Sequence, residues 1–189
     1  MKLGFIGCGV ISIAHVEGLE ELKRKGLETF ELSAVCDIQK ERAENFALEV
    51  EKKRLGKRPV VYTEYHVMLE NEQLDAVSIL INHDLHHTVA EDCFAAGVHV
   101  QMQKPLAISP SFGRKKMIAD AKKYHRVLTL SEPSVLGAEN VAIARAVKEG
   151  AIGPVSLIMD YATVTLNRGF FCWYAMAAYE RSSWSGMDQ

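Results

Sequence analysis

Short apolar runs alternate with longer amphipathic segments along the first two thirds of the chain. The runs are rich in β-branched side chains, and the longer segments repeat apolar residues at helical spacing. The runs predict strands at residues 3–6, 30–36, 60–62, 75–81, 98–102 and 127–130. The longer segments predict helices at 11–22, 39–55, 86–96 and 109–123, and a short helix capped by Thr63. Strands that alternate with helices indicate a parallel sheet covered by helices on both faces.

The alternation ends after Ser131. A helix is expected at 139–149, a turn at Gly153-Pro154 and one long strand at 155–166. Residues 167–189 have no clear period and are rich in aromatic side chains. We therefore expect a first domain at 1–131 and a second at 132–189, with the boundary near residues 131–133.

Composition is that of an ordinary globular protein. The chain is 48% hydrophobic, and its 22 basic and 24 acidic side chains give a net charge of −2. This balance argues against disorder and against nucleic-acid binding. The longest aliphatic and aromatic run, 170–179, is ten residues, and a membrane span needs about 20. Four widely spaced cysteines without a CxxC pair favour free thiols and a cytoplasmic location.

A glycine loop follows the first predicted strand. Gly7 permits a tight turn, and Gly9 lets main-chain N–H groups approach phosphates at the start of the next helix. Ser12 occupies the third small position of this motif. The alternative is an ordinary strand-to-helix turn. Because the loop is the first βα turn of a βαβ unit, the dinucleotide interpretation is favoured.

An acidic residue, Asp37, ends the second predicted strand. An acid here accepts hydrogen bonds from ribose hydroxyls and repels a 2′-phosphate. Asp37 lies 28 residues after Gly9, somewhat beyond the usual spacing of about 20. No arginine directly follows it, so NAD is favoured over NADP. The alternative is a solvated acid at a strand end.

A histidine-rich turn at 82–87 follows the fourth predicted strand, and ligands of open α/β sheets bind beyond the carboxyl ends of strands. His83, Asp84 and His87 offer a metal set, which would suit a hydrolase. No metal site is predicted, because His83 precedes the helix and the cysteines do not join in. A polar loop with capping histidines remains an alternative to a loop that contacts the cofactor.

Lys104 is the main candidate for chemistry. Pro105 disfavours a helical conformation at Lys104, so the ammonium is expected to extend from the strand end. There it can hydrogen-bond a substrate hydroxyl and exchange its proton during hydride transfer. The alternative is a solvated surface lysine.

Four segments together resemble the glucose–fructose oxidoreductase, inositol dehydrogenase and rhizopine-catabolism (Gfo/Idh/MocA) family of NAD(P)-dependent oxidoreductases. They are residues 4–15, 34–47, 74–107 and 143–157. The most specific features are Leu85-His86, Ala96-Gly97-x-His99-Val100 and Lys104-Pro105. The resemblance covers most of residues 1 to about 165.

The resemblance implies an α/β fold: a Rossmann-type doubly wound parallel sheet followed by the start of an incomplete α+β substrate domain. Residues 1–131 would bind NAD(P), and 132–189 would belong to a partial domain for substrate and oligomerisation. The implied activity is hydride transfer between nicotinamide and a hydroxyl-bearing carbon of a sugar- or polyol-like substrate. The alternative is a non-catalytic NAD(P)-binding sensor or regulatory module.

The resemblance also implies roles for individual residues. Cofactor contacts are expected from Gly7, Gly9, Val10, Ile11, Asp37, Ile81, Asn82, His86, Gln103 and Lys104. The first four would contact the pyrophosphate, and Asp37 the adenosine ribose. Ile81, Asn82 and His86 would line the cofactor crevice. Lys104 would contact substrate and nicotinamide as the proton-handling residue.

Three departures from the family pattern bear on these expectations. Ile81-Asn82-His83 replaces a Thr-Pro-Asn-like turn, and Gln103 replaces a glutamate. A neutral amide beside Lys104 would make an uncharged lysine base easier to form. The chain ends at Gln189, whereas family members continue to a helix that completes the active site. We expect a fragment, a truncated product or a chain that forms a homo-oligomer through its C-terminal segment. The missing substrate-domain residues argue against activity of this chain alone.

Overall fold

The structure is a computed structural model that describes residues 1–27, 29–109, 113–132 and 137–155 of the 189-residue chain. Its contacts divide the chain into one unit at Met1–Gly137 and a second that begins at Ala138. Each unit is considered by itself. The predicted domains 1–131 and 132–189 stay a prediction.

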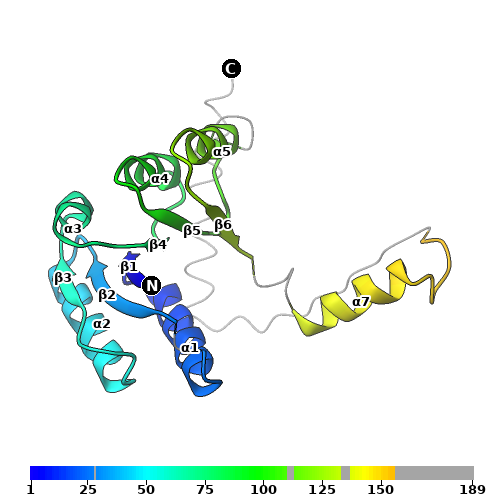
Figure 1. The fold of residues 1–189 in the computed structure, drawn as a ribbon, viewed down its shortest axis with the longest axis horizontal. Helices are drawn as coiled ribbons and strands as arrows, with labels where there is room; N and C mark the ends of the chain where they lie inside the picture. The colour runs from blue at the N-terminus through cyan, green and yellow to red at the C-terminus, as the bar shows by residue number, and fades with distance from the viewer. Residues whose placement is uncertain (28, 110–112, 133–136, 156–189) are drawn as a thin grey trace, which may run out of the picture. The chain divides into compact units, whose positions relative to one another are not determined.

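Six parallel strands form the sheet of the first unit (Figure 1). They are β1 (Lys2–Ile6), β2 (Glu31–Cys36), β3 (Val60–Tyr62), β4 (Ala76–Ile79), β5 (His99–Gln103) and β6 (Leu128–Ser131). Their order across the sheet is β3-β2-β1-β4-β5-β6. This is the order of the doubly wound Rossmann fold, so the predicted fold of this unit is confirmed.

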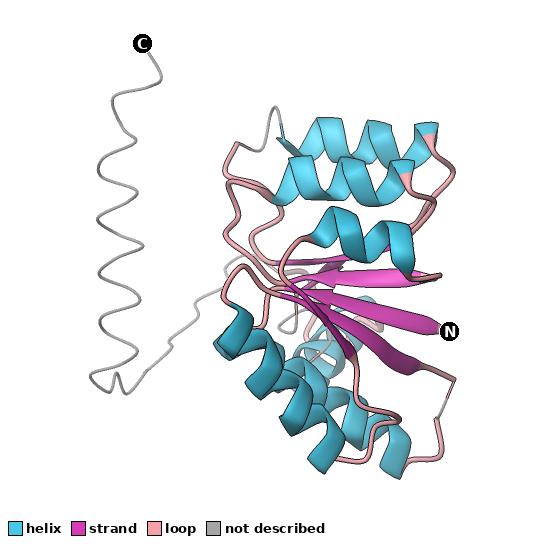
Figure 2. Ribbon diagram, turned by 90° about the vertical axis from the view of Figure 1, so that its left-hand side faces the viewer, coloured by secondary structure: helices cyan, strands magenta, loops and turns pink. Residues whose placement is uncertain are grey.

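The helices cover both faces of the sheet (Figure 2). Buried residues of α1 (Val10–Arg24) and α2 (Lys40–Lys52) share one apolar core with β1 and β2. Buried residues of α3 (Tyr65–Asn71), α4 (His86–Ala95) and α5 (Gly113–Lys123) share the other. Successive side chains of each strand point to opposite faces of the sheet and so pack into both cores. The strands therefore have few polar positions.

Several element ends differ from the expected ones, most clearly in α3, α2 and β4. The predicted cap at Thr63 is wrong: α3 begins after Glu64, and no side-chain hydrogen bond caps it. The helix α2 ends at Lys52 because Arg54 adopts a left-handed conformation with φ of 53°. The strand β4 ends at Ile79, after which Leu80 and Ile81 turn past the glycine loop.

Polar contacts tie the outer helices α3, α4 and α5 together. The Tyr65 hydroxyl donates a hydrogen bond to the Asp92 carboxylate at 2.6 Å, joining α3 to α4. The Lys116 ammonium lies 2.7 Å from Glu91 and 2.9 Å from Asp120, joining α5 to α4. These contacts hold this helix layer over β4 and β5.

The described part of the second unit is mainly one helix, α7 (Ala138–Lys148). It coincides closely with the predicted helix at 139–149, and none of its side chains is buried within the described part of the chain. The predicted strand at 155–166 and the aromatic segment after it lie outside the described residues, apart from Val155. Among the described helices, none has the length and apolar character needed to cross a bilayer.

Neighbouring positions on α5 test the packing of the sheet. Met117 is fully buried, whereas Ile118 is 42% exposed. Met117→Ala should lower the free energy of unfolding by about 2–5 kcal/mol, because it leaves a cavity between α5 and the sheet. Ile118→Ala on the same helix is the matched control and should cost less than half as much. Urea denaturation measures both, and equal losses would contradict this packing.

Candidate functional site

The predicted site residues follow the carboxyl ends of four strands. Gly7 and Gly9 come after β1, Asp37 after β2, Ile81 and Asn82 after β4, and Lys104 after β5. All of these strands are parallel, so their carboxyl ends share one edge of the sheet. The structure therefore brings the predicted residues to a common edge, where open α/β sheets bind ligands.

Gly7 makes the tightest turn at this edge. Its φ is 98°, a left-handed conformation that favours glycine, and its N–H donates to the Cys36 carbonyl at 2.8 Å. A Cβ at Gly7 would lie 2.5 Å from the carbonyl oxygen of Leu80. The end of β1 thus passes too close to the chain after β4 to admit any side chain.

Gly9 differs from Gly7 in both its backbone conformation and its surroundings. It precedes α1 with φ of −77°, which any residue can adopt, and a Cβ there would meet nothing within 4 Å. No side chain caps the N-terminus of α1, and Val10 beside it is 93% exposed. The Ser12 N–H donates within the turn to the Gly9 carbonyl at 3.1 Å, whereas the chain at Gly9 and Val10 borders open space. A diphosphate fits there, because helix N-termini favour negative charge.

Ser12 and Ile11 continue the first turn of α1. Ser12 is fully buried, and its hydroxyl donates to the Gly9 carbonyl at 2.5 Å. A larger residue at position 12 would separate α1 from the sheet. Ile11 is 40% exposed.

Asp37 is buried beneath the loops rather than solvated at the strand end. Its carboxylate accepts hydrogen bonds from the main-chain N–H groups of Cys8 at 3.0 Å and Gln39 at 2.9 Å. The acid therefore holds the glycine loop against the start of α2. Whether it also contacts a ribose stays a prediction.

Sequence reasoning missed Arg42. Its guanidinium lies 3.4 Å from the Asp37 carboxylate and donates to the Gln39 side-chain oxygen at 2.8 Å. No arginine directly follows Asp37 in the sequence, but the first turn of α2 returns Arg42 to the acid. The sequence signal that could have identified this pair is the spacing of five residues from Asp37 to Arg42, across the start of a helix.

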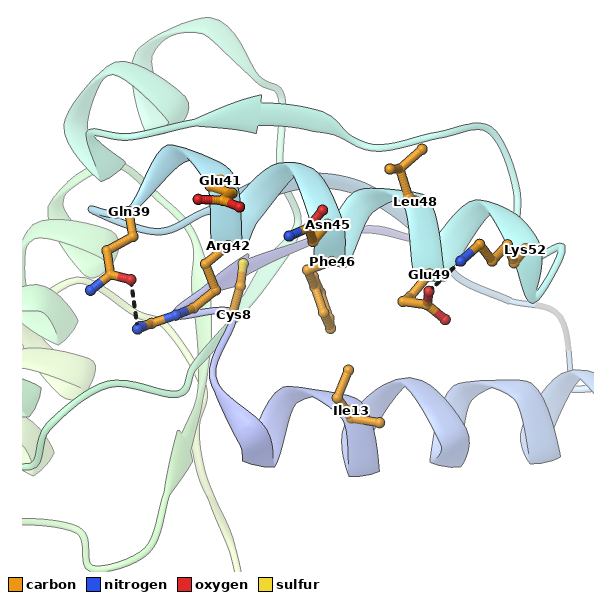
Figure 3. A pocket seen from close by; sticks show the side chains of 10 residues that line it. All are labelled: Cys8, Ile13, Gln39, Glu41, Arg42, Asn45, Phe46, Leu48, Glu49 and Lys52. Atoms are coloured by element: carbon orange, nitrogen blue, oxygen red, sulfur yellow. Dashed lines mark hydrogen bonds and ion pairs between the residues drawn. The ribbon is translucent and has the colours of Figure 1, made fainter. Parts of the chain in front are cut away.

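An open groove runs along α1 and α2 (Figure 3). Figure 3 shows Gln39 and Arg42 at the end near Cys8, whereas Glu49 and Lys52 lie at the far end. Neither Asn82 nor Lys104 lines it. Only the end near Cys8 borders the Asp37 carboxylate, so most of the groove is a helix–helix surface and not part of the candidate site.

The Cys8 thiol lies inside the glycine loop but is poorly suited to covalent chemistry. Burial, with the nearby Asp37 carboxylate as a second cause, raises the pKa of Cys8 to about 12. Burial likewise raises the pKa of Cys36 to about 12. Both thiols stay protonated near neutral pH, and a thiol is a much weaker nucleophile than a thiolate.

His86 lies beneath the turn after β4. Only 1% of its surface is exposed, and burial lowers its pKa. One ring nitrogen is 3.3 Å from the Leu106 carbonyl oxygen and the other 3.2 Å from that of Ile81. His86 therefore joins the turn after β4 to the segment after β5. Its predicted place in the cofactor crevice stays a prediction, as do those of Ile81 and the exposed Asn82.

In the described ranges, no group of three or more histidine, cysteine, aspartate or glutamate side chains is placed to hold a metal ion.

Gln103 is the last residue of β5, and Lys104 follows it directly. Lys104 is exposed, and the peptide bond to Pro105 is cis. Gln103 is 8% exposed, and its side-chain oxygen accepts a hydrogen bond from the Lys104 main-chain N–H at 2.7 Å. Its side-chain nitrogen lies 3.4 Å from the His15 ring, a contact that the sequence pattern alone did not indicate.

These features together suit a dinucleotide that lies across the sheet edge. The uncapped start of α1 would hold the diphosphate, and Asp37 and Lys104 flank it on either side in the strand order. The order β2-β1-β4 also contains the reversal point at which doubly wound sheets bind nucleotides.

Comparison with known proteins yields a family match over residues 1–132. The model is that of the GFO_IDH_MocA oxidoreductase family, described as an NAD-binding Rossmann fold. The match covers the sheet and every candidate site residue.

Named relatives include two dehydrogenases. The chain is 30% identical over 154 residues to D-apiose dehydrogenase of Paraburkholderia graminis, covering 80% of this chain and 37% of that protein. It is 28% identical over 153 residues to myo-inositol 2-dehydrogenase of Thermotoga maritima, covering 81% and 42%. The chain thus spans about two fifths of the length of these relatives.

The fold also matches solved structures. One is the WlbA dehydrogenase of Bordetella pertussis, crystallised with NADH and UDP-GlcNAcA. It has a TM-score of 0.70 and 22% sequence identity, and the match covers 80% of this chain and 43% of that one. At this identity the similarity establishes the shared fold alone.

The two loop glycines should respond differently to alanine. Gly7→Ala should lower the free energy of unfolding by about 2 kcal/mol or more, because it combines a left-handed φ with a main-chain clash. Gly9→Ala should change it by less than about 0.5 kcal/mol. Parallel urea denaturation measures both variants. A large loss at Gly9 would contradict the open space described for it.

Proposed function

The chain belongs to the Gfo/Idh/MocA family of NAD-binding oxidoreductases, and from that membership we propose that it transfers a hydride between NAD and a hydroxyl-bearing carbon of a sugar- or polyol-like molecule. The observation that carries the proposal is the open, uncapped start of α1 at the same sheet edge as Asp37 and Lys104. The substrate class is supported by relatives named for D-apiose and myo-inositol.

Cofactor binding depends mainly on main-chain groups. Gly7 turns the chain, and Gly9, Val10 and Ile11 present N–H groups to the diphosphate at the positive end of α1. Ile81 and Asn82 flank the loop on the β4 side. When bound, the nicotinamide accepts or supplies the hydride. This chain contributes placement and a route for the proton.

Asp37 is proposed to select NAD. Its carboxylate sits next to the loop, so a 2′-phosphate there would meet a buried negative charge. Arg42 offsets part of that charge at 3.4 Å, but its guanidinium is 45% exposed and solvent weakens the pairing. The net preference is therefore for NAD over NADP.

Lys104 is proposed to handle the substrate proton. In the direction of oxidation, neutral Nζ accepts the hydroxyl proton while the hydride leaves the same carbon. In reduction, the ammonium donates that proton back. The residue fits this role because it follows β5 directly and is exposed at the sheet edge.

Oligomer formation through the C-terminal segment and a cytoplasmic location remain part of the proposal. The first depends on residues outside those described. The second depends on free thiols: Cys8, Cys36 and Cys93 are unpaired and buried.

Coenzyme titration tests the binding part of this function. The 189-residue chain should bind NADH at least tenfold more tightly than NADPH, as followed by reduced-nicotinamide fluorescence. Asp37→Asn should lower this preference by about tenfold, since it removes the charge but keeps the side-chain shape. Asp75→Asn, on the strand-start side of the sheet, is the control. Absence of binding to either coenzyme would overturn the proposed function.

Substitution of Lys104 tests the chemical part. With NAD and either D-apiose or myo-inositol, Lys104→Met should lower the rate of NADH formation by at least about 100-fold, because the proton acceptor is lost. Its affinity for NADH should fall much less than the rate, because main-chain groups at the start of α1 supply most of the cofactor binding. Lys115→Met, at an exposed position of α5, is the matched control. An unchanged rate in Lys104→Met would reject the role of Lys104, and NADH binding by a chain that never turns over would favour the non-catalytic module.

A further inference from the structure

One contact spans the candidate site from side to side. His15 lies on α1, just after the glycine loop, and Gln103 is the last residue of β5, just before Lys104. The His15 Nε2 atom and the Gln103 Nε2 atom are 3.4 Å apart, although the residues are 88 positions apart in sequence. The contact therefore joins the diphosphate side of the site to the Lys104 side.

The neighbouring main chain fixes the direction of the Gln103 amide. The Lys104 main-chain N–H is a donor only, and it lies 2.7 Å from the Gln103 Oε1 atom. Gln103 must therefore accept there, which directs its NH₂ group to His15. Because an NH₂ group only donates, His15 Nε2 must be the unprotonated nitrogen, and its proton must be on Nδ1.

The surroundings of His15 favour this neutral state. Its ring is half-buried and packs edge-on against Phe5 at 6.1 Å between centroids, and Phe5 stacks on Phe46 of α2 at 6.0 Å. Burial of the ring lowers the pKa of His15. Of the charged residues near His15 or Gln103 in the sequence, Lys104 is the nearest, directly after Gln103.

We propose that His15 and Gln103 are positioning residues, a neutral hydrogen-bonded pair that holds the start of α1 and the Lys104-Pro105 turn in register for one dinucleotide. The proposal rests on the proposed function. Movement of α1 away from β5 would break the pair, so the contact resists separation of the diphosphate site from the proton-handling lysine. Gln103 thus acts on His15 and the main chain of Lys104.

A glutamate at position 103 would require a protonated Nε2 atom on His15, whereas glutamine requires an unprotonated one. A carboxylate has no N–H to donate, so the Gln103→Glu variant would need a proton on His15 Nε2 and would favour the imidazolium. The glutamine pair is intact when His15 is neutral and breaks as pH falls through the pKa of His15. The glutamate pair would instead strengthen as pH falls.

Imidazole NMR of the intact chain tests the pair itself. The ¹⁵N shifts of His15, assigned by loss of its signals in His15→Phe, should show a proton on Nδ1 at pH 8 and a pKa below about 6.5. Gln103→Glu should raise the pKa of His15 above that value. Gln101→Glu is the matched control, because it adds the same charge on the same strand two residues away, where Gln101 accepts from Ser78. It should leave the pKa of His15 unchanged.

NADH titration at pH 8 and at a pH about one unit below the His15 pKa located by NMR tests the positioning role. The affinity of the native chain should fall by about 3- to 10-fold at the lower pH relative to its value at pH 8, the size expected for one hydrogen bond. Gln101→Glu should behave like the native chain. Gln103→Glu should gain affinity at the lower pH, and Gln103→Met should be weak at both.

A proton on Nε2 in the native chain, or an unchanged pKa of His15 in Gln103→Glu, would overturn the pair. If the NMR results are as expected but NADH affinity depends on pH in the same way in all variants, the positioning role is overturned. Absence of NADH binding by the native chain at both pH values would overturn the proposed function, even where the NMR result upholds the pair.

Discussion

The close passage of β1 past the end of β4 is the constraint on which the rest of this structure depends. At Gly7 the two chains approach until the Leu80 carbonyl occupies the place of a side chain. This approach brings the first βα loop onto the sheet edge and directs α1 along one face of the sheet. The small, fully buried Ser12 then lets α1 pack closely on the sheet, and no side chain caps the start of that helix at the edge.

Buried polar groups stabilise the loops around that edge. Asp37 accepts hydrogen bonds from the loop after β1 and from the start of α2, and His86 lies between carbonyls from two different loops. Such groups are costly to bury unless they are paired. Each therefore fixes the relative position of the loops that it contacts. The candidate site is preorganised by side chains that lie below its surface.

Much of the fold was predictable because each strand is a compact apolar run and each helix has an apolar stripe. The loop at Gly7 and Gly9 and the position of Asp37 followed from the same pattern. The misplaced end of α2 reflects the left-handed Arg54, a residue type that gives no such signal. The contacts of Arg42 and His15 were not predictable, because they depend on how a helix folds back or on a partner 88 residues away.

The two loop glycines differ in which substitutions evolution could tolerate. Position 7 is constrained by the protein's own main chain, whereas position 9 has an ordinary backbone conformation and empty surroundings. A descendant that no longer used a nucleotide would keep glycine at position 7 in order to fold. At position 9 it would be free to drift. Given the proposed contact of Gly9 with a nucleotide, variation at position 9 would record ligand use separately from selection for folding.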